Sequence, residues 1–110
     1  MQERLLGKDK QQLAYAATIV LSINDKADTD ISIPAAGNCA LSVTIPKTAE
    51  WGDRLKVIIL ANATGGTFTP GAGFSGLTAS TIVAAASKGA IISFVFDGAK
   101  YCEENRSVMV

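Results

Sequence analysis

The chain has 110 residues, with ten basic and ten acidic side chains and no histidine. This length indicates a single domain, and balanced charge without a basic run argues against nucleic acid as a partner. No stretch approaches the eighteen or so apolar residues that a membrane-spanning helix needs, so we expect no membrane contact.

The proportion of charged residues is low, at 18% against about a quarter in typical soluble domains. Alanine, valine, isoleucine and threonine are abundant instead, and we expect part of the surface to be covered by other protein. Oligomerisation or docking on a larger body would cover it. The alternative is a soluble monomer with an alanine-rich surface.

Residues 1–14 are the most charged and glutamine-rich part of the chain, and Leu5 and Leu6 lie among these polar residues. We expect a short helix or an extended arm, of the kind that becomes ordered on a partner. The sequence MQERLLGKDKQQ contains no apolar signal-peptide core. We therefore expect synthesis in the cytoplasm and retention there until the protein is used.

Three strands are predicted between residues 17 and 46, where alternation and β-branched residues begin. They are ATIVLSI (17–23), TDISIP (29–34) and CALSVTIP (39–46), separated by turn-forming stretches. Prolines end the second and third strands, because proline cannot donate to a strand ladder. The alternation points Ser42 and Thr44 outward, and it points the apolar residues inward: Ile31, Ile33, Cys39, Leu41, Val43 and Ile45.

The connection KTAEWGD (47–53) carries the only tryptophan, Trp51, and leads into the strongest predicted strand, RLKVIILAN (54–62). The apolar run at 57–60 indicates a strand covered on both faces, or covered by the core on one face and by a neighbouring subunit on the other. ATGG (63–66) has the glycines of a hairpin turn and leads into a short strand, TFTP (67–70).

The last third begins with the loop GAGFSGL (71–77), followed by TASTIVAAASKG (78–89), which fits either a strand or an alanine-rich helix. GAIISFVFDG (89–98) is a strong strand, and its Asp97-Gly98 pair turns into AKYCEE (99–104) as a hairpin partner. NRSVMV (105–110) adds a last short strand. About eight short strands predict an all-β fold, an antiparallel β-sandwich of jelly-roll type over residues 15–110, behind a polar N-terminal arm.

The loop contains a glycine motif, because GAGFSG places Gly71, Gly73 and Gly76 in the G-x-G-x-x-G pattern. Asp97 follows about twenty residues later, where a dinucleotide-binding fold keeps its ribose-binding acid. That fold needs a strand directly before the glycines, and here the strong strand ends near Asn62. We therefore interpret the glycines as conformational, letting the loop turn and carry Phe74 as an anchor. Nucleotide binding is kept as a remote alternative.

No group of residues predicts catalysis or a bound cofactor. Histidine, which is the commonest general base and the commonest metal ligand, is absent. The two cysteines, Cys39 and Cys102, lack the spacing of a zinc site. We expect both to be buried small hydrophobes, and whether they lie close together is left open. The carboxylates fall mainly in turns, so we predict no enzyme, no metal and no cofactor.

The chain resembles small all-β virion proteins of tailed bacteriophages, from about residue 17 to residue 103. The resemblance is carried by TDISIPAAGNCALSVTIP, by WGDRLKVIILANATGGTFTPGAGFSG and by GAIISFVFDGAKYCE. These families include capsid decoration (cement) proteins and tail or fibre modules. The resemblance implies a structural protein without catalytic residues, placed on the capsid surface as a homotrimer through contacts with the major capsid protein or another virion protein.

The resemblance also implies which residues contact partners. An N-terminal arm would reach a neighbour, with Leu5 and Leu6 filling a pocket and Arg4 pairing with an acid. A tail or fibre module would instead touch a host-surface saccharide through exposed aromatic rings. The candidates are Trp51, Phe74 and Tyr101, of which Phe74 and Tyr101 also fit an ordinary core.

Overall fold

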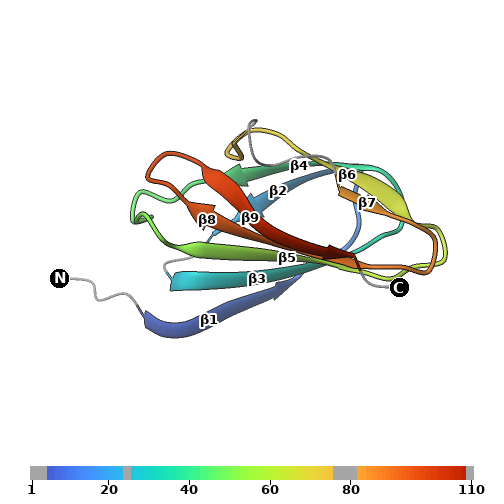
Figure 1. Ribbon diagram of the computed structural model, residues 1–110, viewed down its shortest axis with the longest axis horizontal. Coiled ribbons are helices and arrows are strands. Elements are labelled where there is room, and N and C mark those ends of the chain that lie inside the picture. Colours follow the sequence, from blue (N-terminus) through green and yellow to red (C-terminus); the bar gives the residue numbers. More distant parts are fainter. Residues whose placement is uncertain (1–4, 24–25, 76–81, 109–110) are drawn as a thin grey trace.

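Two stacked β-sheets form the computed structural model, which describes residues 5–23, 26–75 and 82–108 (Figure 1). Sheet A has five strands in the order β1 (Leu5–Gln12), β3 (Lys26–Pro34), β5 (Arg54–Leu60), β8 (Ala90–Phe96) and β9 (Tyr101–Val108). Sheet B has four strands in the order β2 (Thr18–Ser22), β4 (Cys39–Thr44), β6 (Gly66–Pro70) and β7 (Ile82–Ala84). The predicted all-β, sandwich-like arrangement is confirmed.

The direction of the strands differs from the prediction. The chain alternates between the two sheets through its first six strands, so β1, β3 and β5 run parallel in sheet A and β2, β4 and β6 run parallel in sheet B. Among the strands that the structure describes, only the pairs β5–β8, β6–β7 and β8–β9 are antiparallel. The antiparallel jelly roll was therefore wrong, and the two sheets do not close into a barrel.

The connections between the sheets explain the parallel pairing. Those that cross from sheet A to sheet B pack against one another, so the strands that follow them start side by side and run in the same direction. The predicted hairpin turn at 63–66 instead carries the chain from β5 in sheet A to β6 in sheet B. Gly66 lies so close to the Gly37 carbonyl, in the connection from β3 to β4, that it has no room for a side chain. The Thr67 amide donates to Asn38 Oδ1 at 3.0 Å, and the Tyr15 hydroxyl donates to the Asn38 carbonyl at 2.5 Å. The three crossings from sheet A to sheet B are thus joined at one end of the sandwich.

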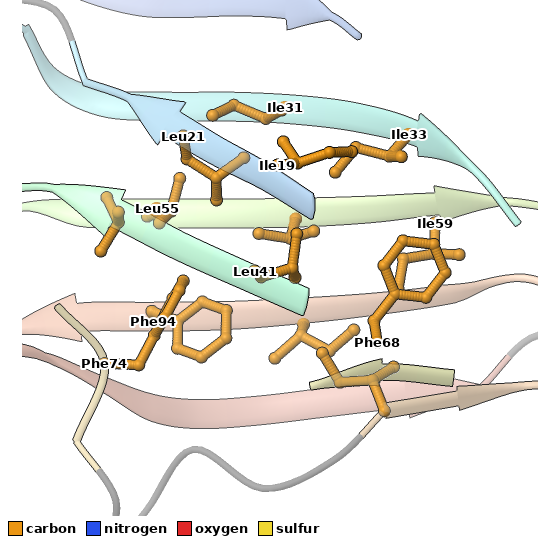
Figure 2. Close-up of a cluster of buried hydrophobic side chains, with 14 of the residues drawn as sticks. Ile19, Leu21, Ile31, Ile33, Leu41, Leu55, Ile59, Phe68, Phe74 and Phe94 are labelled. Carbon is orange, nitrogen blue, oxygen red and sulfur yellow. The ribbon is translucent and has the colours of Figure 1, made fainter. Parts of the chain in front are cut away.

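The core fills the space between the inner faces of the sheets (Figure 2). Ile19, Leu21 and Leu41 from sheet B point towards Ile31, Leu55 and Phe94 from sheet A. Burying each such side chain stabilises the fold by about 1.5–3 kcal/mol. The predicted inward set is confirmed for Ile31, Ile33, Cys39, Leu41 and Val43, while Ile45 is only partly buried.

The strongest predicted strand has one buried face and one outer face. In β5, Leu55, Val57 and Ile59 are buried, whereas Ile58 is half-buried and Leu60 is 44% exposed. The apolar run at 57–60 therefore supplies both the core and the outer surface of sheet A.

The C-terminal hairpin is confirmed by the antiparallel pairing of β8 with β9. Asp97 closes the turn, since its Oδ1 accepts hydrogen bonds from the amides of Ala99 and Lys100, both at 2.8 Å. Residues 105–108 continue β9 beyond an irregularity in the register instead of forming a separate strand. Within 78–89, Ile82–Ala84 is strand β7, and residues 78–81 lie outside the described residues.

The predicted N-terminal arm contains a strand. β1 pairs with β3 at the edge of sheet A, and Gln12 at its end lies beside Ser32. Cys39 and Cys102 are both free, and they belong to β4 in sheet B and β9 in sheet A, respectively.

Candidate docking surfaces

The five predicted contact residues fall in different surroundings. Arg4 lies outside the described residues, as do the side chains of Leu5 and Leu6, whose backbone belongs to β1. Trp51 is the most exposed large apolar side chain among the described residues, at 81%. Phe74 is buried, with 3% exposed. Of the five, the two whose side chains are described, Trp51 and Phe74, therefore do not form one exposed site.

Phe74 belongs to the core and is unavailable to a partner in this structure, which corrects its assignment as a contact. Its ring lies 4.8 Å from that of Phe94, centroid to centroid, at an angle of 52° (Figure 2). Such tilted aromatic pairs contribute about 0.5–1.5 kcal/mol beyond the area that they bury. Tyr101 is also buried, at 1% exposed, and packs against Phe96.

The glycine loop holds the two sheets together at one end of the sandwich. The Gly71 amide donates to Leu41, and the Val43 amide donates to Ala72, so the loop continues the ladder beside β4. The Tyr101 amide in β9 donates to the Gly73 carbonyl, at 2.9 Å. The loop therefore joins sheet B to sheet A.

In this role the loop shows few of the features of a dinucleotide-binding site. The fingerprint needs a helix whose N-terminus faces the phosphates, and the described residues downstream begin with strand β7. The amides of Gly71 and Phe74 already donate within the chain, and Gly76 lies outside the described residues. The conformational role of Gly73 is direct, because its φ of 88° is positive and a Cβ there would collide with Val43.

A fixed turn presents Trp51 to solvent. The buried carboxylate of Asp53 accepts a hydrogen bond from the Glu50 amide at 3.0 Å, and the Asp53 amide returns one to the Glu50 carbonyl at 3.1 Å. Gly52 has a φ of 91° and donates its amide to Phe96 in β8 at 2.8 Å. These bonds hold the turn, so the indole ring is exposed on a preorganised support. Rigid aromatic anchors of this kind are enriched at binding hot spots.

The outer face of sheet B carries no charge at any of its described strand positions. Val20 and Val83 are 56% and 59% exposed on it, and a shallow depression lies over Ala40, Thr67 and Thr69. We call this surface the B face. Its residues are Thr18, Val20, Ser22, Ala40, Ser42, Thr44, Thr67, Thr69 and Val83.

The outer face of sheet A, which we call the A face, is charged. The strand register aligns Lys10, Asp30 and Lys56 across three neighbouring strands, with Arg54 one row away. Arg54 pairs with Glu104 of β9, and both side chains are substantially exposed. Exposed pairs of this kind contribute about 0–1 kcal/mol to stability, but they keep a face soluble. The A face residues are Lys10, Gln12, Asp28, Asp30, Ser32, Arg54, Lys56, Ile58, Ile91, Ser93 and Val95.

The sequence contains both charged and uncharged outward positions, but it does not show which of them share a face of the molecule. The outward positions of 17–23 and 39–46 are uncharged, whereas 28–30 and 54–56 hold acids and bases. Alternation identifies outward positions within one strand, but it does not say which strands share a sheet. The face emerges only once β2 and β4 are known to be neighbours.

The described residues include no candidate metal site. No group of three or more cysteine, aspartate or glutamate side chains among them is placed to hold a metal ion. In the same part of the chain, no helix is long and apolar enough to cross a membrane. Comparison with known proteins finds no matching family model and no matching curated protein.

Proposed function

We propose that this chain is a structural protein of a tailed-bacteriophage virion, a capsid decoration protein that binds the assembled shell as a homotrimer and stabilises it. The observation that supports this role best is the uncharged B face opposite a charged A face. A surface without charge is suited to contact with protein, and a charged surface to contact with water. The resemblance to virion proteins supplies the setting, namely the capsid surface after synthesis in the host cytoplasm.

The physical basis of stabilisation is linkage. A protein that binds only the assembled shell stabilises that shell by an amount set by its concentration and affinity. Three copies joined through their B faces would bind the shell several times at once, so that weak contacts add to firm attachment.

The exposed Trp51 ring is a proposed contact with the shell, together with the arm residues Arg4, Leu5 and Leu6. The turn that carries Trp51 is already fixed, so that binding loses little conformational freedom. Trp51 is the only tryptophan, and tryptophan fluorescence therefore reports on the surroundings of this one ring.

The direct test is to count copies on a purified particle and to add the protein to shells that lack it. Decoration predicts hundreds of copies per particle, on the order of the number of capsomers, and a higher melting temperature of the shell. A few copies per particle, with no effect on shell melting, would exclude the decoration role.

The exposed Trp51 ring also favours one alternative, a tail or fibre module that contacts a host-surface saccharide. Sugar rings stack on exposed aromatic faces, and Trp51 is 81% exposed. Titrating the protein with host-surface polysaccharide while recording its fluorescence separates the two roles. A saturable shift, together with loss of saccharide binding by Trp51→Ala in calorimetry, supports the alternative, and an unchanged spectrum supports decoration.

A further inference from the structure

Strand β2 is an edge of sheet B, and it lacks the features that protect the other edges of the sandwich. An unprotected edge presents amides and carbonyls that pair readily with another strand. Among the edge strands that the structure describes, β7 has only three residues, and β1 and β9 each combine a register irregularity with charged side chains. The sequence of β2, TIVLS, contains no charged residue, proline or glycine, and its pairing with β4 is regular over its whole length. It is therefore the described edge best suited to accept a further strand.

The ladder between β2 and β4 shows which backbone groups of β2 face the open side. In a parallel ladder, successive residues direct their amides and carbonyls to opposite sides of the strand. The Ala40 amide of β4 donates to the Ala17 carbonyl at 2.9 Å, so the odd-numbered residues of β2 face β4. Thr18 and Val20 therefore direct their amides and carbonyls to the open side, where no backbone group in the described part of the chain pairs with them.

The position next to β2 lies opposite the inner face of β1. Sheet A has one strand more than sheet B. Figure 2 shows Ile19 and Leu21 of β2 beside Ile31 of β3, so a strand added beyond β2 would lie opposite β1, the next strand of sheet A. A direct contact supports this placement, because Gln11 Nε2 of β1 donates to the carbonyl of Ser22 in β2 at 2.8 Å.

The inner face of β1 is polar. The register places Asp9 beside Thr29 and Gln11 beside Ile31. Since Thr29 and Ile31 are buried between the sheets, their partners in β1 face the same way, and both are half-buried. Gln11 Nε2 also donates to Asp9 Oδ2 at 2.9 Å. A strand opposite β1 would therefore meet a carboxylate and an amide, and charge complementarity favours a lysine or arginine side chain facing Asp9.

The offset between the two sheets decides what kind of strand fits. A second copy of this sandwich could present its own β2 edge only together with its β3 and β1 strands. Those strands would have to enter the space that β1 of the first copy already fills. An extended segment without a second layer meets no such obstacle. The position beside β2 therefore favours a single extended segment of another protein.

We propose that the β2 edge binds an extended, basic segment of another protein as a fifth strand of sheet B. The segment pairs its backbone with Thr18 and Val20 and directs a lysine or arginine towards Asp9. Its outward side chains are uncharged and continue the B face. Strand addition of this kind takes its affinity from main-chain hydrogen bonds and its specificity from alternate side chains. The inference is independent of the virion role, because it concerns only the chemistry of this edge.

The test titrates the isotope-labelled protein with capped synthetic peptides of about seven residues, enough for one strand. One peptide alternates valine with lysine, and its matched control alternates valine with glutamate. Strand addition predicts saturable shifts of the Thr18 and Val20 amide resonances. The lysine peptide should bind about tenfold more tightly than the glutamate peptide, because only lysine is attracted to the Asp9 carboxylate. Methylating every backbone amide of the lysine peptide should abolish binding, because the peptide can then no longer donate to β2.

Variants of β1 test the role of charge. Asp9→Asn removes the carboxylate at nearly constant shape, and it should abolish the preference for the lysine peptide. Asp9→Lys should reverse the preference. Lys10→Glu is the matched control, because Lys10 lies beside Asp30 on the outer face of the same strand. It should leave the preference unchanged.

The proposal is overturned if millimolar lysine peptide produces no saturable shift, or if the shifts are confined to amides outside β2. Equal affinity of the native protein for the lysine and glutamate peptides overturns it as well. Shifts of the Thr18 and Val20 amides with protein concentration alone, without peptide, would identify a second copy as the occupant and would also contradict it.

Discussion

Gly73 is a residue at which conformation and packing both exclude a side chain. Its φ is positive, and a Cβ would overlap Val43 in β4. We predict that Gly73→Ala lowers the free energy of unfolding by about 3 kcal/mol or more, combining backbone strain with overpacking. Gly52→Ala is the matched control, because Gly52 also has a positive φ but open space around it. It should cost only about 1–2 kcal/mol. Equal losses in urea unfolding would refute the packing argument.

Thr29 is buried, and its Oγ1 has no hydrogen-bond partner within the described structure. A buried hydroxyl without a partner loses its hydration and gains nothing in return. We predict that Thr29→Val raises the free energy of unfolding by about 1 kcal/mol, since valine has the same shape without the hydroxyl. Thr29→Ser keeps the hydroxyl and removes a methyl group, and it should lower stability. A loss of stability in both variants would contradict this account.

At the scale of the element, the turn between β8 and β9 depends on the charge of Asp97. Hydrogen bonds from the Lys100 amide first, then from Ala99 and the Cys102 thiol, hold the pKa of Asp97 below its ordinary value of 3.8. A lowered folded-state pKa contributes stability that is present above the ordinary pKa and is lost as the pH falls through the lower folded value. Because Asp97 is fully exposed, the effect is small.

We therefore predict that the stability difference between the native protein and Asp97→Asn is largest at pH 7 and disappears in acid, below the lowered pKa. Asparagine can still accept the two amide hydrogen bonds, so the substitution removes mainly the ionisation. Urea unfolding at a series of pH values measures the difference. A difference that is the same at pH 7 and in acid would show that Asp97 acts through geometry alone.

The N-terminal segment can be removed without unfolding the domain if β1 adds little to the core. We predict that deleting residues 2–12 leaves a cooperatively folded sandwich but weakens attachment to the shell, because the arm contacts are lost. Extending the deletion to residue 16 removes Leu13 and Tyr15 as well, and it should cost much more stability. Full attachment after the shorter deletion would argue against any role of the arm.

How far the sequence predicts this fold depends on how local the signal is. Alternation is a property of a few consecutive residues, so the strands and inward residues such as Ile31 and Leu41 could be read from it. Strand pairing is not local. A turn such as 63–66 serves a hairpin or a crossing between sheets equally well, and only contacts between distant segments, such as Gly66 with Gly37, decide which is formed. The B face could not be predicted for the same reason, because it depends on which strands are neighbours. For Trp51, the sequence offered exposure as one interpretation among several.

At the scale of the whole molecule, charge is unequally distributed. The A face carries Lys10, Asp30 and Lys56, whereas the B face exposes Val20 and Val83 and has no charge on its described strand positions. Of the two outer faces, the A face therefore holds the charged residues and the B face the uncharged ones. We predict that Val20→Glu combined with Val83→Glu dissociates the oligomer, because each copy would bury unpaired charge. Ser107→Glu on exposed β9 is the control and should leave the mass unchanged.

The central claim is that copies of this chain associate through the uncharged B face. The measurement that tests it most directly is the solution mass, by light scattering on a size-exclusion column at low and at high salt. Apolar contacts are not weakened by salt screening, whereas contacts between exposed charges are. We predict a trimer at both salt concentrations. A monomer at both, at concentrations well above those needed on a particle, would contradict the claim.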